Sequence, residues 1–407
     1  MTIAESPKNQ ERLVSLDQFR GYTVAGMFLV NYFGAFAVCP KVWRHSHDYL
    51  SYADTIMPHF LFAVGFALRL TFGRRMASQG SFSAYGRMVK RLLGLLLVSF
   101  IVYNVGSRAE TWEQLTERGW WGCIRDPLKR EWFQTLTHIA VTSLWILPVI
   151  HRSTMVRLFW LIASGLLHVF LSYQFNFTWT NTAPNAIDGG PLGFLTWCIP
   201  ALMGSLTCDV FLPQNGYSIQ RKIGWSLTVG GLLMLVGWGL SCGTRFYDVP
   251  ESLTTELKEI KLADDPVWPS AFRVESKTAS ASWNDYLAEP PFVPPPNAEH
   301  RKWNYWMMSQ RAGTLTYLVF AAGFSIVVYL AFYLVCDVGK VQLPFFRTLG
   351  TNALLGYVLH SMVASAVKPF VPKDAPDWYA YGSLFVFFLI TWLILRTFEK
   401  QGYFLRV

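Results

Sequence analysis

Residues 56–68 read IMPHFLFAVGFAL, an apolar run whose only polar side chain is a histidine. The run belongs to a longer window, 52–72, which reaches the roughly 20 residues that a helix needs to cross the hydrocarbon core of a bilayer. Similar windows occur along the whole chain. The sequence therefore predicts an all-α polytopic membrane protein whose immediate partner is the lipid bilayer.

The overall composition agrees with this prediction. Of the 407 residues, 52% are hydrophobic and only 15% are charged, which is rare among soluble proteins of this length. The net charge of +9 does not indicate a nucleic-acid partner, because the lysines and arginines flank hydrophobic segments instead of forming one patch. We expect a membrane protein that binds no nucleic acid.

We predict a bundle of about ten transmembrane helices, each spanning roughly 20 residues. The expected spans are 19–38, 52–72, 88–106, 131–150, 154–173, 191–211, 222–242, 313–336, 345–367 and 379–397. Lysine and arginine are more frequent in the short loops on the side of the N-terminus, so both termini are expected in the cytoplasm. The first dozen residues are polar and no small-residue cleavage site follows, so we expect no cleavable signal peptide.

The chain divides into three parts. Residues 1–242 hold the first seven expected helices, residues 243–312 form an extracytoplasmic insert, and residues 313–407 hold the last three helices. The insert contains DDPVWPS and EPPFVPPPNAEH, and such proline-rich stretches resist helix formation. So long a loop is either a disordered linker or a functional cap, and its tryptophans and tyrosines favour the cap.

The six cysteines are dispersed and show neither CxxC nor metal-ligand spacing, so we predict no disulfide framework and no metal site. Cys39, Cys123 and Cys242 fall on one side of the predicted membrane, and a bridge among them stays open.

Charged and polar residues inside the expected spans are the candidates for function, because burying them in a membrane is costly. In the first span, Asp17 and Arg20 are one helical turn apart and can meet. Arg20 and Asn31 lie on one stripe of that helix, roughly 16 Å apart along it. The structural alternative is an interfacial ion pair and an asparagine that joins two helices.

Two further spans carry polar residues at a spacing of four. Asn352, Gly356 and His360 share one helical face in the ninth span, and Gln134 and His138 share a face in the fourth. Each set either lines a pocket or makes hydrogen bonds between helices.

The loop RHSHDYLSYAD, residues 44–54, places two histidines and two aspartates where two hydrophobic segments meet. It is either a solvated turn or the chemical centre of the protein.

Four stretches together resemble the heparan-α-glucosaminide N-acetyltransferase family. They are RLVSLDQFRGYTVAGMFLVNYFG, ADTIMPHFLFAVGFAL with a histidine before it, GPLGFLTWCIPALMGSLTCD and FFRTLGTNALLGYVLH. The resemblance covers most of the chain outside 243–312 and implies a ten-span membrane core. That core would take an acetyl group from cytoplasmic acetyl-CoA, as cosubstrate, and pass it to a sugar amine on the far side.

The resemblance also implies catalytic residues. The family has a catalytic histidine in the first outer loop and an asparagine at the end of the first span, which corresponds to Asn31. Counting back from Asp54 and allowing a one-residue deletion gives His45, and His47 is the alternative. Histidine suits removal of a proton from the acceptor, Asp48 or Asp54 would orient its ring, and Asn31 would donate to the oxyanion.

The remaining candidates serve the two substrates. We expect a cofactor-binding set for the CoA phosphates at the cytoplasmic mouth, namely Asp17, Arg20, Lys90 and Arg91. We expect a substrate pocket that includes Asn352, His360, Gln134 and His138.

Several alternatives stay open at this point. The acceptor is an amino sugar, a sugar hydroxyl or a cell-envelope glycan, and the acetyl group either passes directly or rests first on histidine. A secondary transporter of a small solute, or an inactive membrane scaffold of the same family, is the competing function. The resemblance to bacterial members suggests a bacterial inner membrane, and a homodimer is an open alternative to a monomer.

Overall fold

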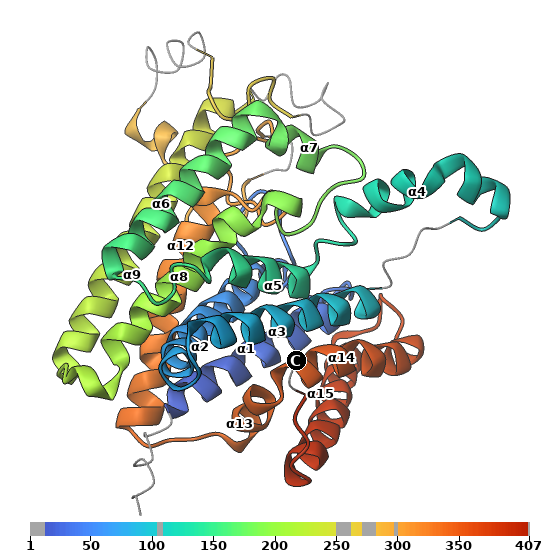
Figure 1. Cartoon of the computed structure of the whole chain (residues 1–407). Helices are drawn as coiled ribbons and strands as arrows, with labels where there is room; N and C mark the ends of the chain where they lie inside the picture. Colours follow the sequence, from blue (N-terminus) through green and yellow to red (C-terminus); the bar gives the residue numbers. More distant parts are fainter. Residues whose placement is uncertain (1–12, 104–108, 250–261, 271–281, 297–299, 406–407) are drawn as a thin grey trace, which may run out of the picture.

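The protein is all-helical throughout the part of the chain that its computed structural model describes, residues 13–103, 109–249, 262–270, 282–296 and 300–405. Within these ranges there is no strand, and only two isolated bridges occur, Asp248 with Arg301 and Leu262 with Trp303. The helices form one bundle from which α4 projects (Figure 1). The predicted all-α class is confirmed for the described residues.

The helices follow one another along the chain with short 3-10 or π-helical turns between several of them. Their bounds are α1 Val14–Phe33, α2 Ile56–Gln79, α3 Ser81–Val102, α4 Trp112–Leu128, α5 Thr135–Ile146, α6 Thr154–Leu171, α7 Phe177–Asn181, α8 Phe194–Phe211, α9 Ile219–Ser241, α12 Leu315–Phe332, α13 Pro344–Thr351, α14 Ala353–Val367 and α15 Asp377–Lys400.

Among the described residues, seven helical segments are long and apolar enough to cross a membrane, which indicates an integral membrane protein. They are Ala53–Gln79, Thr154–Asn181, Gly190–Phe211, Ile219–Tyr247, Leu315–Val338, Ala353–Phe370 and Asp377–Lys400. These seven correspond to seven of the ten expected spans.

The other three expected spans do not meet that standard. The segments at 19–38 and 88–106 overlap α1 and α3, which are long enough but are made too polar by residues such as Asp17, Gln18 and Arg20 in α1 and Arg87, Lys90 and Arg91 in α3. Residues 104–106 lie outside the described part of the chain. The segment at 131–150 contains α5, an apolar helix of only 12 residues. Most of α1 is buried among other helices, including Ser15, Gln18 and Thr23, whereas Asp17 and Arg20 are partly accessible and Asn31 is exposed.

The expected ninth span, 345–367, is not one helix. It is divided at Asn352 into α13 and α14, because Asn352 has φ −117° and ψ 37°, which is not helical. Its carbonyl accepts from the backbone N–H of Gly356 at 2.8 Å and so begins α14. Asn352 therefore lies at the junction that begins α14, whereas Gly356 and His360 lie four residues apart within that helix.

Close helix contacts depend on glycines that face a neighbouring backbone. Gly65 on α2 lies against the Ala201 carbonyl, and Gly204 on α8 lies against the Phe62 carbonyl. A Cβ atom at either position would overlap the carbonyl oxygen. This reciprocal pair lets α2 and α8 approach at backbone distance, as small residues do in membrane bundles.

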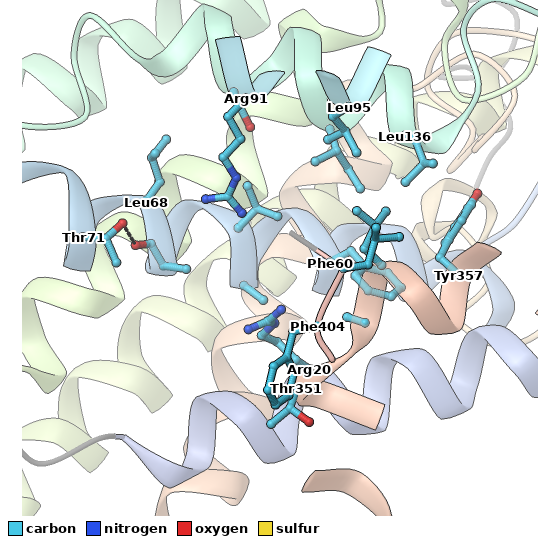
Figure 2. Close-up of a pocket in the computed structure, with 18 of the residues that line it drawn as sticks. Arg20, Phe60, Leu68, Thr71, Arg91, Leu95, Leu136, Thr351, Tyr357 and Phe404 are labelled. Atoms are coloured by element: carbon cyan, nitrogen blue, oxygen red, sulfur yellow. Dashed lines mark hydrogen bonds between the residues drawn. The ribbon is translucent and has the colours of Figure 1, made fainter. Parts of the chain in front are cut away.

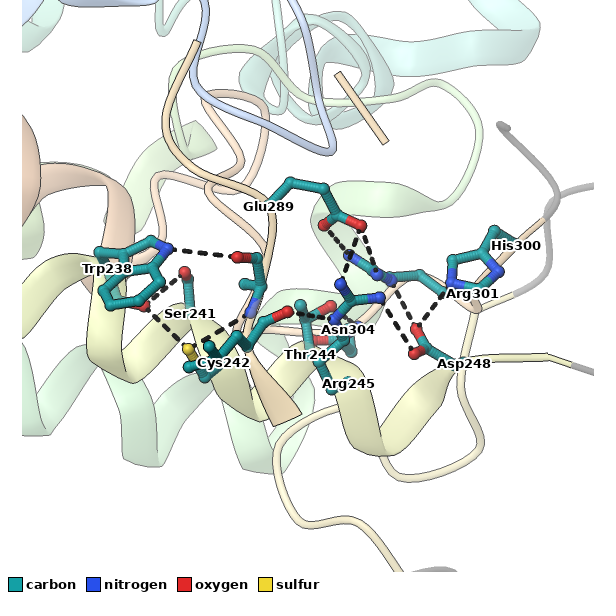
Figure 3. Close-up of polar contacts among 12 residues, drawn as sticks. Trp238, Ser241, Cys242, Thr244, Arg245, Asp248, Glu289, His300, Arg301 and Asn304 are labelled. Carbon is teal, nitrogen blue, oxygen red and sulfur yellow. Dashed lines mark hydrogen bonds and ion pairs between the residues drawn. The ribbon is translucent and has the colours of Figure 1, made fainter. Parts of the chain in front are cut away.

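The segment between α9 and α12 packs on the bundle in its described parts, whereas residues 250–261, 271–281 and 297–299 lie outside them. Figure 3 shows its ionic cluster, in which the buried Arg301 contacts Asp248 at 2.8 Å and Glu289 at 3.1 Å. Arg245 adds ion pairs to both carboxylates. The backbone N–H of Phe292 donates to the Leu50 carbonyl at 2.9 Å, which joins the segment to the loop after α1.

All six cysteines are free thiols, so the bridge left open among Cys39, Cys123 and Cys242 is absent from the structure.

The Gly65–Gly204 contact yields a stability prediction. Gly65→Ala should lower the melting temperature in detergent, because the new methyl group overpacks against backbone at a cost of about 1–3 kcal/mol or more. Gly73→Ala on the same helix is the matched control, since nothing lies near its Cβ position. Equal melting temperatures for the two variants would show that α2 and α8 are not packed this closely.

Candidate functional site

Two cavities lie end to end inside the bundle, with volumes of about 670 Å³ and about 430 Å³. We call the larger one the basic cavity, since Arg20, Arg75, Arg91 and Arg347 line it. We call the smaller one the histidine cavity, since His45 and His47 line it. The same four helices, α1, α2, α5 and α14, contribute to both walls.

Phe60 of α2 and Tyr357 of α14 line both cavities and therefore lie between them. Both side chains appear at one end of the basic cavity in Figure 2. Helix α1 passes from one cavity to the other, because Arg20 lines the basic cavity and Asn31 lines the histidine cavity. The two residues are 11 positions apart, roughly 16 Å along a helix.

His45 and Asp54 form the most ordered polar contact in the histidine cavity. The Nδ1 atom of His45 lies 2.9 Å from Oδ1 of Asp54. The other carboxylate oxygen accepts from the backbone N–H of Ser46 at 3.2 Å and from the Ser51 hydroxyl at 2.7 Å. Because Asp54 is acceptor-only when ionised, Nδ1 carries the proton and Nε2 is left with its lone pair.

The His45 side chain is 43% accessible, whereas that of Asp54 is 1% accessible. Burial lowers the pKa of His45, but the hydrogen bond and charge of Asp54, with the charge of Asp188, outweigh it and raise the pKa above its ordinary value. His45 is thus a stronger base than an ordinary histidine, and its ring is held toward the cavity by the Asp54 carboxylate.

His47 differs from His45 although it lies two residues away. Burial, followed by the charge of Arg311, lowers the pKa of His47 to about 4. Its Nδ1 atom is buried and has no hydrogen-bond partner among the described residues. His47 is therefore neutral near pH 7 and a weak base, and the geometry favours His45 for proton transfer.

Asp188 is a wall residue that the sequence reasoning missed. It has φ 53° and is followed by two glycines, Gly189 and Gly190, that also have positive φ. Its Oδ1 accepts from the Gln310 amide at 2.5 Å. Burial raises the pKa of Asp188 to about 6 against the opposing influence of His45. An acid in the AIDGG turn before an apolar run was the only local signal.

Asn31 reaches the cavity with support from His360. The Asn31 Nδ2 atom lies 3.2 Å from Nε2 of His360, whose Nδ1 faces the Tyr357 carbonyl at 2.5 Å. This arrangement requires Nδ1–H of His360 to donate to Tyr357 and Nε2 to accept from Asn31. One Asn31 N–H therefore remains for the cavity, while His360 lies behind Asn31 and outside the lining.

The other expected pocket residues separate. Gln134 lines the histidine cavity, but His138 is fully buried against Trp197 and lines neither cavity. Asn352 also lines neither cavity, and its buried amide has no partner among the described residues. Asn352 is the residue between α13 and α14, whereas Tyr357 and His360 are one turn apart within α14.

Three of the four residues expected at the cytoplasmic mouth line the basic cavity. Asp17 and Arg20 pair at 3.9 Å, and the guanidinium groups of Arg20 and Arg91 extend into the same space in Figure 2. Lys90 is exposed and is not part of the wall. Lys90 and Arg91 are consecutive residues of α3, so their side chains point about 100° apart around the helix.

Three wall residues complete the site and had no sequence signal of their own: Phe60, Arg130 and Arg311. They come from three separate parts of the chain. No group of three histidine, cysteine or acidic side chains suited to a metal ion occurs in the described ranges.

No family model matches the chain, and no curated protein matches it either. The two cavities are therefore the feature of the molecule that bears on function.

The His45–Asp54 contact yields a titration prediction. Asp54→Asn removes the main charge that raises the pKa of His45 and leaves burial, which lowers it and exceeds the remaining effect of Asp188. In NMR titrations of protein with labelled histidine, the His45 pKa should lie above about 6.5 in the wild type and below it in the variant. Asp48→Asn is the matched control, because Asp48 contacts Ser46 and not His45. An unchanged His45 pKa in Asp54→Asn would contradict the pairing.

Proposed function

We propose that this protein is a membrane acyltransferase that moves an acetyl group from acetyl-CoA to an amino sugar or sugar hydroxyl. The observation that carries the proposal is the pair of end-to-end cavities that meet at Phe60 and Tyr357. One cavity has the charge to hold CoA, and the other has a base and an amide donor. Such a pairing suits a group that must travel between two substrates at opposite ends of a bundle.

The basic cavity suits the CoA phosphates. Four arginines and two carboxylates line it, so positive charge prevails. Arginine guanidinium groups recognise phosphate through paired, charge-assisted hydrogen bonds. The distance of roughly 16 Å between Arg20 and Asn31 is comparable to an extended pantetheine arm. The thioester would then reach Asn31 while the phosphates stay with the arginines.

The histidine cavity suits acyl transfer. The lone pair of the neutral acceptor amine or hydroxyl attacks the thioester carbonyl carbon, and Nε2 of His45 takes the proton that the acceptor loses. The resulting oxyanion accepts a hydrogen bond from the remaining Asn31 N–H. When the tetrahedral intermediate collapses, the C–S bond breaks and the CoA thiolate takes the proton from the His45 imidazolium. Asp54 stabilises that imidazolium, and each proton is accounted for.

The proposed orientation of the protein in the membrane follows from the proposed CoA site. The basic cavity is lined by Asp17 near the start of α1 and by Phe404 after α15, so both ends of the described chain lie on its side. We propose that this side is the cytoplasm of a bacterial cell. The segment between α9 and α12, whose Gln310 and Arg311 line the histidine cavity, then lies outside as a cap. Counting α1, α3 and α5 as further spans gives the ten-span topology.

A secondary transporter is the second candidate, because two cavities at opposite ends of a bundle also suit a solute path. The presence of the His45–Asp54 pair and the Asn31 amide in one cavity favours the transferase, since acyl transfer needs a base and an oxyanion donor at the same place. A transporter would show solute counterflow in liposomes without thioester cleavage.

The transferase proposal predicts a large loss in His45→Ala. Purified protein should transfer label from acetyl-CoA to an amino sugar, and His45→Ala should lower kcat about 10²–10⁴-fold, as expected for loss of a general base. His47→Ala should lower it far less, because its imidazole is a weak base. Absence of acetyl-CoA binding by the wild type would rule out the enzyme. A larger loss in His47→Ala would transfer the catalytic role to His47.

The position of Phe60 and Tyr357 between the two cavities predicts that a change there affects acetyl transfer and not CoA binding. Phe60→Trp adds bulk where the two cavities meet, so kcat should fall about tenfold or more because the thioester is misplaced. CoA binding, measured by calorimetry, should stay within about twofold, since the arginines are unchanged. Phe60→Leu is the control that keeps the passage open and the side chain apolar. Equal kcat in Phe60→Trp and wild type would show that the acetyl group does not pass Phe60.

A further inference from the structure

Two arginines in the histidine cavity have no role in the transfer itself. Arg130 lies in the turn between α4 and α5 and is exposed, whereas Arg311 precedes α12 and is half-buried. They are 181 positions apart in sequence, yet both line the same wall. Burial and the charge of Arg130 lower the pKa of Arg311, so the two guanidinium groups are near each other.

Among the described residues, neither arginine forms an ion pair. Arg311 lies instead over the Trp303 ring, 4.6 Å from its centre, which holds the guanidinium in place. By contrast, the exposed Arg125 pairs with Asp126 at 3.0 Å. Two like charges at one wall repel each other unless an anion lies between them. The same charges contribute to the low pKa of His47, after burial.

The acidic groups of the cavity are already engaged elsewhere. Asp188 accepts from Gln310 and lies near Thr135, and Asp54 is held by His45 and two serines. The charge of Asp188 also contributes to the raised pKa of His45, so Asp188, Asp54 and His45 form one negative region. The cavity therefore has a negative region around His45 and a positive region around Arg130 and Arg311.

We propose that Arg130 and Arg311 form an anion-binding subsite, so that the acceptor carries an amine and a phosphate, sulfate or carboxylate on one small molecule. The amine lies toward His45 and the anionic group toward the two arginines. This inference rests on the proposed function and specifies its acceptor. A volume of about 430 Å³ is near the small end of ligand pockets and suits one charged sugar unit.

The charge separation also explains orientation. An ammonium group is repelled from the arginines and attracted to the negative region, while the anionic group has the opposite preference. The bound ammonium loses one proton to solvent, and the neutral amine then attacks with His45 as base. Only one orientation then satisfies both ends, and it brings the amine to the Nε2 side of His45. A neutral amino sugar lacks this second contact and would bind in several orientations.

The experiment compares acceptors with and without the anionic group. With labelled acetyl-CoA, glucosamine 6-phosphate should exceed glucosamine in kcat/KM by about tenfold or more, the effect of one charge-assisted contact. Arg130→Gln and Arg311→Gln should each reduce that ratio about tenfold, and Arg311→Lys should reduce it less. Arg125→Gln, outside the cavity, should leave it unchanged. Glucosamine 6-sulfate and glucosaminuronic acid distinguish the three anions.

A binding measurement separates failure of this inference from failure of the proposed function. Calorimetry with N-acetylglucosamine 6-phosphate needs no transfer, and its affinity should fall in Arg130→Gln and Arg311→Gln but not in Arg125→Gln. Transfer with equal kcat/KM for both acceptors would overturn the subsite and leave the transferase intact. Arginine-dependent binding without transfer would support the subsite and overturn the transferase. If Arg311→Gln does not fold, Arg130→Gln decides the outcome.

Discussion

The buried carboxylate of Asp54 is the constraint on which the site depends. A charge taken out of water must be paired and hydrogen-bonded, or it becomes strongly destabilising. Asp54 meets that demand with His45, Ser46 and Ser51, all from the same short loop. Its backbone carbonyl accepts from Tyr317 of α12 at 2.5 Å, which anchors the loop to a helix far along the chain. Fixing one carboxylate therefore fixes the loop, the start of α2 and the direction of the histidine ring.

The sequence predicts what local apolarity determines and not what tertiary contact determines. Segments such as α8 and α12 are apolar over their whole length, so their spans are visible in sequence. The break at Asn352 is not predicted, although Gly350, Thr351 and Asn352 are weak helix formers, because such residues also occur inside membrane helices. The choice between Lys90 and Arg91 depends on helix rotation, which spacing alone leaves free. Arg130, Asp188 and Arg311 come from distant segments and meet only in the folded chain.

The two cavities also explain why polar residues are spread unevenly along α1 and α2. On α1, Asp17 and Arg20 line the basic cavity and Asn31 lines the histidine cavity. On α2, Thr71 and Arg75 line the basic cavity beside apolar residues such as Leu68. Backbone contacts at Gly65 and Gly204 hold α2 against α8, so the face that lines the cavities keeps its position. Tight packing on one face and open volume on the other are thus two aspects of one arrangement. The segment that supplies Gln310 and Arg311 completes the histidine cavity from a different part of the chain.

The two aromatic residues between the cavities, Phe60 and Tyr357, bear on how well the membrane holds its proton gradient. A continuous file of water between two cavities at opposite ends of a bundle would let protons run down the membrane potential. An apolar constriction blocks such a file by dewetting, as hydrophobic gates do in channels. When a long, narrow arm enters the constriction, it takes up the space that water would need. In the proposed transferase, such a constriction would let a two-carbon unit cross the bilayer without dissipating the ion gradient on which the cell depends.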